Sequence, residues 1–274
     1  MITADRIDKY YGNVKVLSEI CCQFPKGEVT AVIGENGSGK STLISILGKY
    51  LDPNDGGVFI GDDLFTNIKK DDYALLVSTL RQTNNVQAKI TVREFVSFGR
   101  FPHSKRLLND KDWQIVDRCI GLLGCDEYAD KYLNQLSGGQ LQRVYLAAIF
   151  SQDTPIILLD EPLNNLDLKH SHDLMKIIRD FARNENKTVV IIMHDINMVY
   201  KYADYCIALK HGRIVHCGAI TTFKCKHVLK EIYDLDFDFI RSDNYCVAYV
   251  KEDRIWKKLV LSLCYLCWLL VLLN

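Results

Sequence analysis

Three short segments carry the residues that could do chemistry in this chain. They are GENGSGKST at 34–42, LSGGQLQR at 136–143 and IILLDEP at 156–162. The first has the spacing GxxxxGK[ST], which is typical of a loop that binds the phosphates of a nucleotide. The third places two carboxylates directly after an apolar run. The first and third segments therefore indicate a nucleotide hydrolase, and the second segment narrows the class.

The first segment has the flanks that a phosphate-binding loop requires. The apolar, β-branched run 30–33 predicts a buried strand, and the run 43–47 predicts a helix. Glycines let backbone N–H groups approach phosphate oxygens, and the helix start adds partial positive charge. Lys40 is expected to reach the β- and γ-phosphates and Ser41 to bind Mg²⁺. A chance glycine-rich turn is the alternative. The predicted loop comprises Gly34, Glu35, Asn36, Gly37, Ser38, Gly39, Lys40, Ser41 and Thr42.

The third segment ends a second predicted strand, 155–159, in two acids. A carboxylate at the end of a buried strand can hold a metal ion beside the phosphate loop, and we expect this of Asp160. The next residue, Glu161, can orient or deprotonate the attacking water. Many strands end in acids, so this signal is weak alone. Its position, 120 residues after Lys40 and 20 after Gln140, strengthens it.

The second segment predicts another anion site. Ser137 is followed by Gly138 and Gly139, and these open a predicted helix near Leu141. A helix start with accessible backbone N–H groups binds anions, so one chain would carry two phosphate cradles. An ordinary glycine turn is the alternative interpretation.

In this order the three segments resemble the ATP-binding subunit of an ABC transporter, over roughly residues 1–250. In that family the second cradle serves the nucleotide held by the other subunit of a head-to-tail dimer. The resemblance therefore implies that a second copy is a partner and that ATP and Mg²⁺ are the cofactors. The segment expected to contact the other copy's ATP comprises Ser137, Gly138, Gly139 and Gln140.

Four further positions match the family pattern. Tyr11 matches the aromatic that stacks on adenine, although it would also suit a plain strand. Gln82 matches the glutamine that contacts Mg²⁺ and the attacking water, which makes Ser41, Gln82 and Asp160 the implied metal site. His194, which follows the apolar run 189–193, matches the histidine that contacts the γ-phosphate. Asp167 matches an aspartate that crosses the dimer interface, but the preceding NNL departs from the commoner Ser-x-Leu.

Bulk properties exclude some functions. The 274 residues have a formal net charge of zero and 25% charged residues, so no basic surface indicates nucleic acid. We interpret the ten cysteines as reduced thiols, because the predicted chemistry is cytosolic. Cys264-x-x-Cys267 lies in an apolar run without a second pair, so we do not expect a metal there. We expect no signal peptide.

The predicted fold class is α/β. The resemblance implies a P-loop NTPase (RecA-like) core, an N-terminal antiparallel β subdomain and an inserted α-helical subdomain at about 84–150. We assign residues 1–250 to the ATP-binding domain and 251–274 to an atypical apolar tail. Helices are predicted at 92–99, 111–123, 137–150, 169–184 and 195–203, and later strands at 188–193 and 205–209.

The tail does not fit the family pattern. Residues 259–273 are apolar or nearly so and follow Lys257 and Lys258. A membrane-spanning helix needs about 20 residues. Three interpretations remain open: a short membrane-docking helix, a segment that packs on the domain or a membrane partner, and an altered gene end with no selected role.

Two segments narrow the family. TVREFVSFGRFPHSK at 91–105 resembles subunits that power uptake of iron–siderophore, haem and cobalamin complexes, and DEPLNNLDLKHS at 160–171 resembles the iron–siderophore subset. The resemblance implies a bacterial importer subunit at the cytoplasmic face of the cell membrane. Its partners would be two membrane permease subunits and, indirectly, a substrate-binding protein. Residues 82–105 would contact a permease coupling helix.

Three alternatives compete with this interpretation. Cobalamin or haem would replace the siderophore in related importers. A soluble ABC-type ATPase of DNA repair would need a long coiled coil between the two cradles, but only 97 residues separate Lys40 from Ser137. A binding-only regulatory subunit would lack the reacting groups, whereas Lys40, Gln82, Glu161 and His194 are all present.

Overall fold

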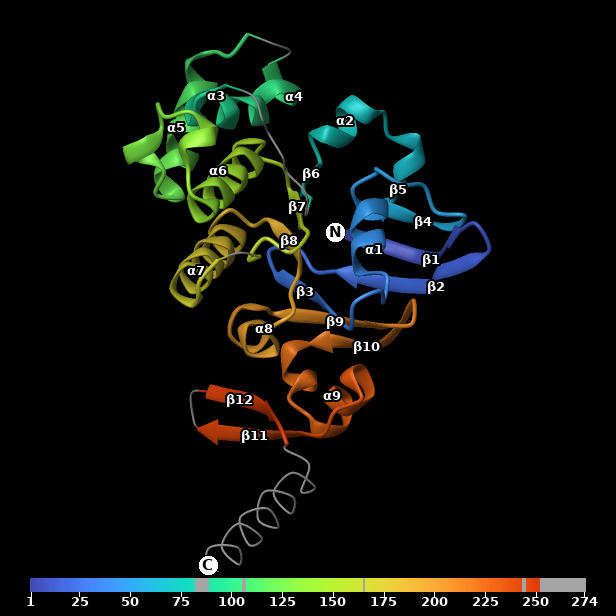
Figure 1. Ribbon diagram of the computed structural model, residues 1–274. Helices are drawn as coiled ribbons and strands as arrows, with labels where there is room; N and C mark the ends of the chain where they lie inside the picture. Colours follow the sequence, from blue (N-terminus) through green and yellow to red (C-terminus); the bar gives the residue numbers. More distant parts are fainter. Residues whose placement is uncertain (82–88, 105–106, 165, 243–244, 252–274) are drawn as a thin grey trace, which may run out of the picture.

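The computed structural model describes residues 1–81, 89–104, 107–164, 166–242 and 245–251, and the statements below concern these ranges. A six-stranded sheet with the order β10-β9-β3-β8-β7-β6 forms the centre of the molecule (Figure 1). All neighbours in it are parallel except β10, which is antiparallel to β9. Its strands are β3 (Val29–Ile33), β6 (Val77–Leu80), β7 (Ile156–Leu159), β8 (Thr188–Ile192), β9 (Tyr205–Lys210) and β10 (Arg213–Ala219).

The central strands are apolar on both faces because both faces are covered. Every residue of β3, β7 and β8 is buried, as expected for a parallel sheet between two layers. Alternate residues belong to two cores: Ile157 and Ile191 pack toward α6, α7 and α8, and Leu158 and Val190 toward α1 and the N-terminal sheet. These helices are α1 (Lys40–Leu47), α6 (Gly138–Ser151), α7 (Leu168–Asn184) and α8 (Ile196–Tyr202).

The predicted N-terminal antiparallel sheet is confirmed. Its order is β2-β1-β4-β5, and all pairs in it are antiparallel. The strands are β1 (Ile2–Tyr11), β2 (Val14–Phe24), β4 (Asp55–Ile60) and β5 (Asp63–Leu64), and the short helix α2 (Lys70–Ala74) follows them. Buried residues of this sheet, of α1 and of the central strands form one core, so α1 packs against both sheets.

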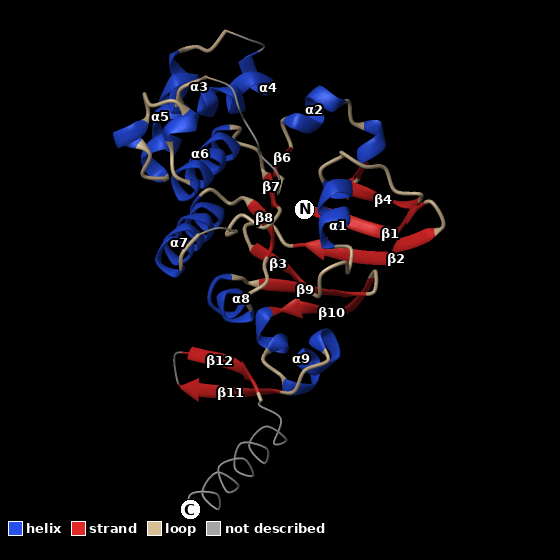
Figure 2. Cartoon of the chain, viewed as in Figure 1, coloured by secondary structure: helices blue, strands red, loops and turns tan. Residues whose placement is uncertain are grey.

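Helices gather at one end of the molecule between β6 and β7 (Figure 2). They are α3 (Val92–Ser97), α4 (Phe101–Ser104), α5 (Asp110–Leu122) and α6. A capping box starts α3, α5 and α6 alike, and it satisfies backbone N–H groups that a helix start leaves open. These boxes explain why three predicted helices begin within one or two residues of the expected positions.

The C-terminal elements were not predicted. Helix α9 (Lys226–Tyr233) leads into a hairpin of β11 (Phe237–Ser242) and β12 (Tyr245–Val250), which packs beside α8 (Figure 1). The side chain of Asn197 in α8 accepts from Ala248 N at 2.8 Å and donates to Ala248 O at 3.1 Å. The apolar run 259–273, with Cys264 and Cys267, lies outside the described residues. Within the described ranges no helix is both long and apolar enough to span a bilayer.

Candidate active site

The predicted phosphate loop lies at the carboxyl end of β3, and α1 begins at Lys40. Two of its glycines have no room for a side chain. A Cβ on Gly34 would lie 2.0 Å from the carbonyl oxygen of Leu209, and one on Gly39 would lie 2.5 Å from Leu17 Cδ2. Both glycines also have positive φ, which L side chains rarely adopt. At Gly37 the space is open, so the loop is packed on one side and accessible on the other.

Lys40 and Ser38 place polar hydrogens inside this loop. Lys40 Nζ donates to the carbonyl oxygens of Gly34 at 2.9 Å and Glu35 at 2.8 Å. Burial lowers the pKa of Lys40, and the carboxylates of Glu161 and Asp160 oppose that shift. Ser38 Oγ is buried and has no hydrogen-bond partner among the described residues. A buried hydroxyl without a hydrogen-bond partner is unfavourable. This geometry therefore fits a bound phosphate whose oxygen accepts a hydrogen bond from Ser38.

Asp160 follows β7 and meets the start of α1. Ser41 Oγ donates to Asp160 Oδ1 at 3.1 Å, and Asp160 is 7% exposed. Burial raises the pKa of Asp160, and the hydrogen bond from Ser41 and the nearby Lys40 only partly offset this. A hydroxyl and a carboxylate form the kind of oxygen donor set that Mg²⁺ prefers. Gln82, the third predicted metal residue, lies outside the described residues.

Glu161 is held in place by its backbone and by both carboxylate oxygens. Its φ of 53° is in the left-handed region, which is strained for a residue with a side chain. Oε1 lies 2.7 Å from His194 Nε2, and Oε2 accepts from Asn164 Nδ2 at 2.6 Å. Burial alone would raise the pKa of Glu161, but the bonds from His194 and Asn164 outweigh it and lower the value. Glu161 is therefore an ionised carboxylate in a fixed position.

A small cavity of about 190 Å³ joins the phosphate loop to Glu161. It brings together residues from β2, the loop, α1 and the end of β7. Tyr11, predicted to stack on adenine, is 52% exposed and does not line this cavity, so its role stays a prediction. Sequence reasoning missed Val16. The lining residues are Val16, Asn36, Gly37, Gly39, Lys40, Ser41, Thr42 and Glu161.

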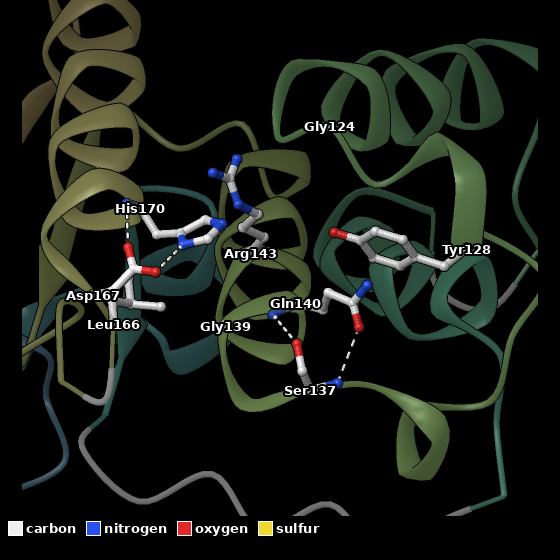
Figure 3. A pocket seen from close by; sticks show the side chains of 9 residues that line it. All are labelled: Gly124, Tyr128, Ser137, Gly139, Gln140, Arg143, Leu166, Asp167 and His170. Atoms are coloured by element: carbon white, nitrogen blue, oxygen red, sulfur yellow. Dashed lines mark hydrogen bonds and ion pairs between the residues drawn. The ribbon is translucent and has the colours of Figure 1, made fainter.

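The segment 137–140 forms a separate cradle at the start of α6. Ser137 Oγ accepts from Gln140 N at 3.3 Å, and Gln140 Oε1 accepts from Ser137 N at 3.0 Å. Apart from its chain neighbours and its own helix, no described atom lies within 4 Å of where a Gly138 Cβ would be, so this position is open on its outer side. This helix start lines a cavity of about 670 Å³, shown in Figure 3. Its walls are Gly124, Tyr128, Ser137, Gly139, Gln140, Arg143, Leu166, Asp167 and His170.

The two cradles are separate within one chain. In the part of the chain that the structure describes, the cavity at the phosphate loop and the cavity at Ser137 share no lining residue. Asp167, however, is brought to the Ser137 cavity, where Leu166 Cδ2 lies 3.3 Å from the position of a Gly139 Cβ. Sequence reasoning noted Asn164 only as a departure from a pattern, and the structure shows that it holds Glu161.

Comparisons with known proteins agree with this geometry. The model of the ABC transporter family matches residues 17–164. The petrobactin import ATP-binding protein YclP of Bacillus subtilis (strain 168) is 40% identical over 244 residues, which cover 89% of this chain and 97% of the relative. The ferric enterobactin transport ATP-binding protein FepC of Escherichia coli (strain K12) is 34% identical over 227 residues, which cover 82% and 84%.

Solved structures show the same fold. An inward-facing metal-chelate type ABC transporter matches with a TM-score of 0.77 and 23% identity, covering 91% of this chain and 96% of that one. The dimeric ABC transporter cassette MJ0796 matches with a TM-score of 0.73 and 27% identity, covering 80% and 99%. A second MJ0796 structure, in a post-hydrolysis state with ADP and Pi, has a TM-score of 0.72 and 26% identity, covering 80% and 99%. The predicted α/β fold with an inserted helical subdomain is thereby confirmed.

Asp160→Asn should stabilise the protein on its own. Asparagine keeps an acceptor for Ser41 Oγ but removes a buried charge. We expect a melting temperature about 2–4 °C higher at about pH 8, which corresponds to about 1 kcal/mol for a chain of this size. An acid whose pKa is raised on folding loses stability as pH rises past its unfolded value of about 3.9. The gain should therefore shrink as pH falls toward that value.

Thermal unfolding at several pH values checks this expectation. Glu161→Gln is the matched control, because it removes a carboxylate whose pKa is lowered in the fold, and it should lower the melting temperature. An Asp160→Asn protein that melts at or below the wild-type temperature at about pH 8 would contradict the unfavourable burial assigned to this carboxylate.

Proposed function

Because the chain belongs to the ABC transporter family, we propose that it hydrolyses ATP to power uptake of iron–siderophore complexes by a bacterial importer. As a member of that family it is an ATPase. The names of three relatives support iron–siderophore complexes as the cargo, since they contain petrobactin, iron(3+)-hydroxamate and ferric enterobactin. The ATP-binding domain is assigned to residues 1–250, with its helical subdomain at about 84–150 and a separate tail at 251–274.

One observation carries the proposal of hydrolysis. Glu161, ionised and fixed by His194, lines the same cavity as Lys40 and Ser41. A carboxylate fixed beside a phosphate loop can accept a proton from a water that attacks the γ-phosphate. His194 bonds to Glu161, and we assign it a contact with that phosphate as well. Lys40, which lines the same cavity, supplies positive charge.

Mg²⁺ is proposed as the accompanying ion, held by Ser41 and Asp160, with Gln82 as a further ligand. When bound, the ion supplies positive charge that stabilises the phosphate oxygens. The raised pKa of Asp160 supports this role, because a buried carboxylate is easier to keep ionised beside a cation.

The separation of the two cradles supports a head-to-tail dimer. Ser137 and Gly138 are exposed, and the cavity at Ser137 shares no lining residue with the cavity at Lys40 of the same chain. A second copy turned head to tail would bring its Ser137 cradle over this chain's phosphate loop. Two ATP molecules would then lie between two copies, each held by one loop and one cradle. ATP drives closure only through its higher affinity for that closed state.

An exposed aromatic cluster supports a membrane-protein partner. Phe98 and Phe101 are 43% and 44% exposed, and their ring centroids are 5.0 Å apart. Between them Arg100 is buried and pairs with Asp112 at 3.0 Å, which fixes this corner against α5. Exposed aromatic rings on a rigid support suit an apolar partner surface. We assign this corner to the contact with a coupling helix of one of two permease subunits. A substrate-binding protein would deliver the cargo to these permease subunits.

With these partners, we assign the chain to the cytoplasmic face of the cell membrane as a peripheral subunit. The zero net charge supports the absence of a nucleic-acid partner.

Glu161→Gln should separate binding from hydrolysis. Glutamine keeps the size of the side chain but cannot accept a proton, so turnover should fall at least about 100-fold. ATP binding should persist, and ATP should shift the protein from monomer to dimer. Turnover assays and size-exclusion chromatography with ATP check both parts. A variant that hydrolyses ATP at the normal rate would remove Glu161 as the base.

The cargo is tested by growth. A host deleted for this gene should fail to grow with an iron–siderophore complex as sole iron source, and the wild-type gene should restore growth. Lys40→Ala should not restore it, because the phosphate contact is lost, whereas Lys26→Ala, in an exposed turn, should restore it fully. Normal growth of the deleted host would contradict iron–siderophore import, and cobalamin and haem would then be tested in the same way.

A further inference from the structure

The carboxylate of Asp167 is held at both oxygens by one residue. Oδ1 accepts from His170 N at 2.8 Å, and Oδ2 lies 2.8 Å from His170 Nδ1. Figure 3 shows both bonds at the wall of the Ser137 cavity. The backbone and side-chain bonds from His170 lower the pKa of Asp167. The aspartate is therefore an ionised group with a fixed direction.

This pair ends a loop that begins at the catalytic base. Asn164, three residues after Glu161, donates to it. Gln142 Nε2, from α6, donates to Pro162 O at 2.8 Å and ties the loop to the Ser137 helix. Leu166 packs against Gly139, and Asp167 then caps α7. A shift of Asp167 would thus disturb the contacts of this loop with the Ser137 cradle and with Glu161.

Both members of the pair remain accessible. The side chains of Asp167 and His170 are 65% and 51% exposed. The imidazole lies between Asp167 and Arg143, with Nδ1 directed at the carboxylate (Figure 3). The Arg143 guanidinium donates to Leu123 O at 3.1 Å. Among the described residues that line this cavity, His170 is the side chain that bonds to the Asp167 carboxylate.

We propose that His170 is a positioning residue that fixes the Asp167 carboxylate for contact with a second copy of the chain. The inference rests on the proposed ATP-driven dimer and names a residue that sets its strength. With alanine at this position, Asp167 keeps only the backbone bond at the helix start, so its second oxygen turns away. A carboxylate with several orientations must be ordered when the copies meet, and this weakens association.

The test measures dimerisation in the Glu161→Gln background with ATP, by analytical ultracentrifugation. Adding His170→Ala should raise the monomer–dimer midpoint concentration up to about tenfold, the size expected for the cost of ordering one side chain at an interface. His170→Asn should restore the midpoint, since its side-chain N–H reaches the same distance from the backbone as Nδ1–H. With Glu161 intact, His170→Ala should lower turnover at low protein concentration and recover at high concentration.

A control separates this role from helix capping. Glu94→Ala removes the equivalent side-chain bond at the start of α3, where Glu94 Oε2 accepts from Thr91 Oγ1 at 2.9 Å. It should change the melting temperature but not the midpoint. If His170→Ala leaves the midpoint concentration unchanged, the role proposed for His170 is wrong, although the proposed dimer is not affected. A Glu161→Gln protein that stays monomeric with ATP would overturn the dimer itself, and the inference with it.

Discussion

The proposed reacting groups Lys40, Asp160, Glu161 and His194 depend on one constraint: parallel strands end at the same edge of a sheet. In the order β3-β8-β7, the phosphate loop follows the first strand, His194 the second and Asp160 with Glu161 the third. Segments separated by 120 residues therefore meet within hydrogen-bond distance, as the Ser41–Asp160 contact shows. Parallel strands can form this edge only because both of their faces are covered. The N-terminal sheet and the helices provide that cover.

The same edge concentrates features that are unfavourable for stability. Lys40 and Asp160 are charged groups with little exposure, and the backbone of Glu161 is in a strained region. Ser38 Oγ is buried without a partner among the described residues. The almost fully buried sheet around them offsets these costs, as is common where a site is held ready for a ligand. Strain and burial here fix Glu161, the proposed base, beside the phosphate loop.

Much of this arrangement could be predicted, because motif spacing pointed to Lys40, Ser41 and Asp160 and the family resemblance pointed to His194. The role of Asn164 was missed, since its bond to Glu161 depends on the left-handed backbone of Glu161, which no sequence pattern reports. Val16 was missed because it comes from a different sheet. The hairpin of β11 and β12 escaped prediction because a two-stranded unit gains its stability from packing beside α8, a contact between distant segments.

The central claim is that each complete site takes its phosphate loop from one copy and its Ser137 cradle from the other. It is tested most directly by mixing two inactive variants. Lys40→Ala disables the loop, and Gly138→Asp places a carboxylate in the cradle. In a mixed dimer, one site carries both changes and the other carries neither. The account predicts that turnover returns on mixing and is greatest at equal amounts. A mixture as inactive as either variant alone would contradict it.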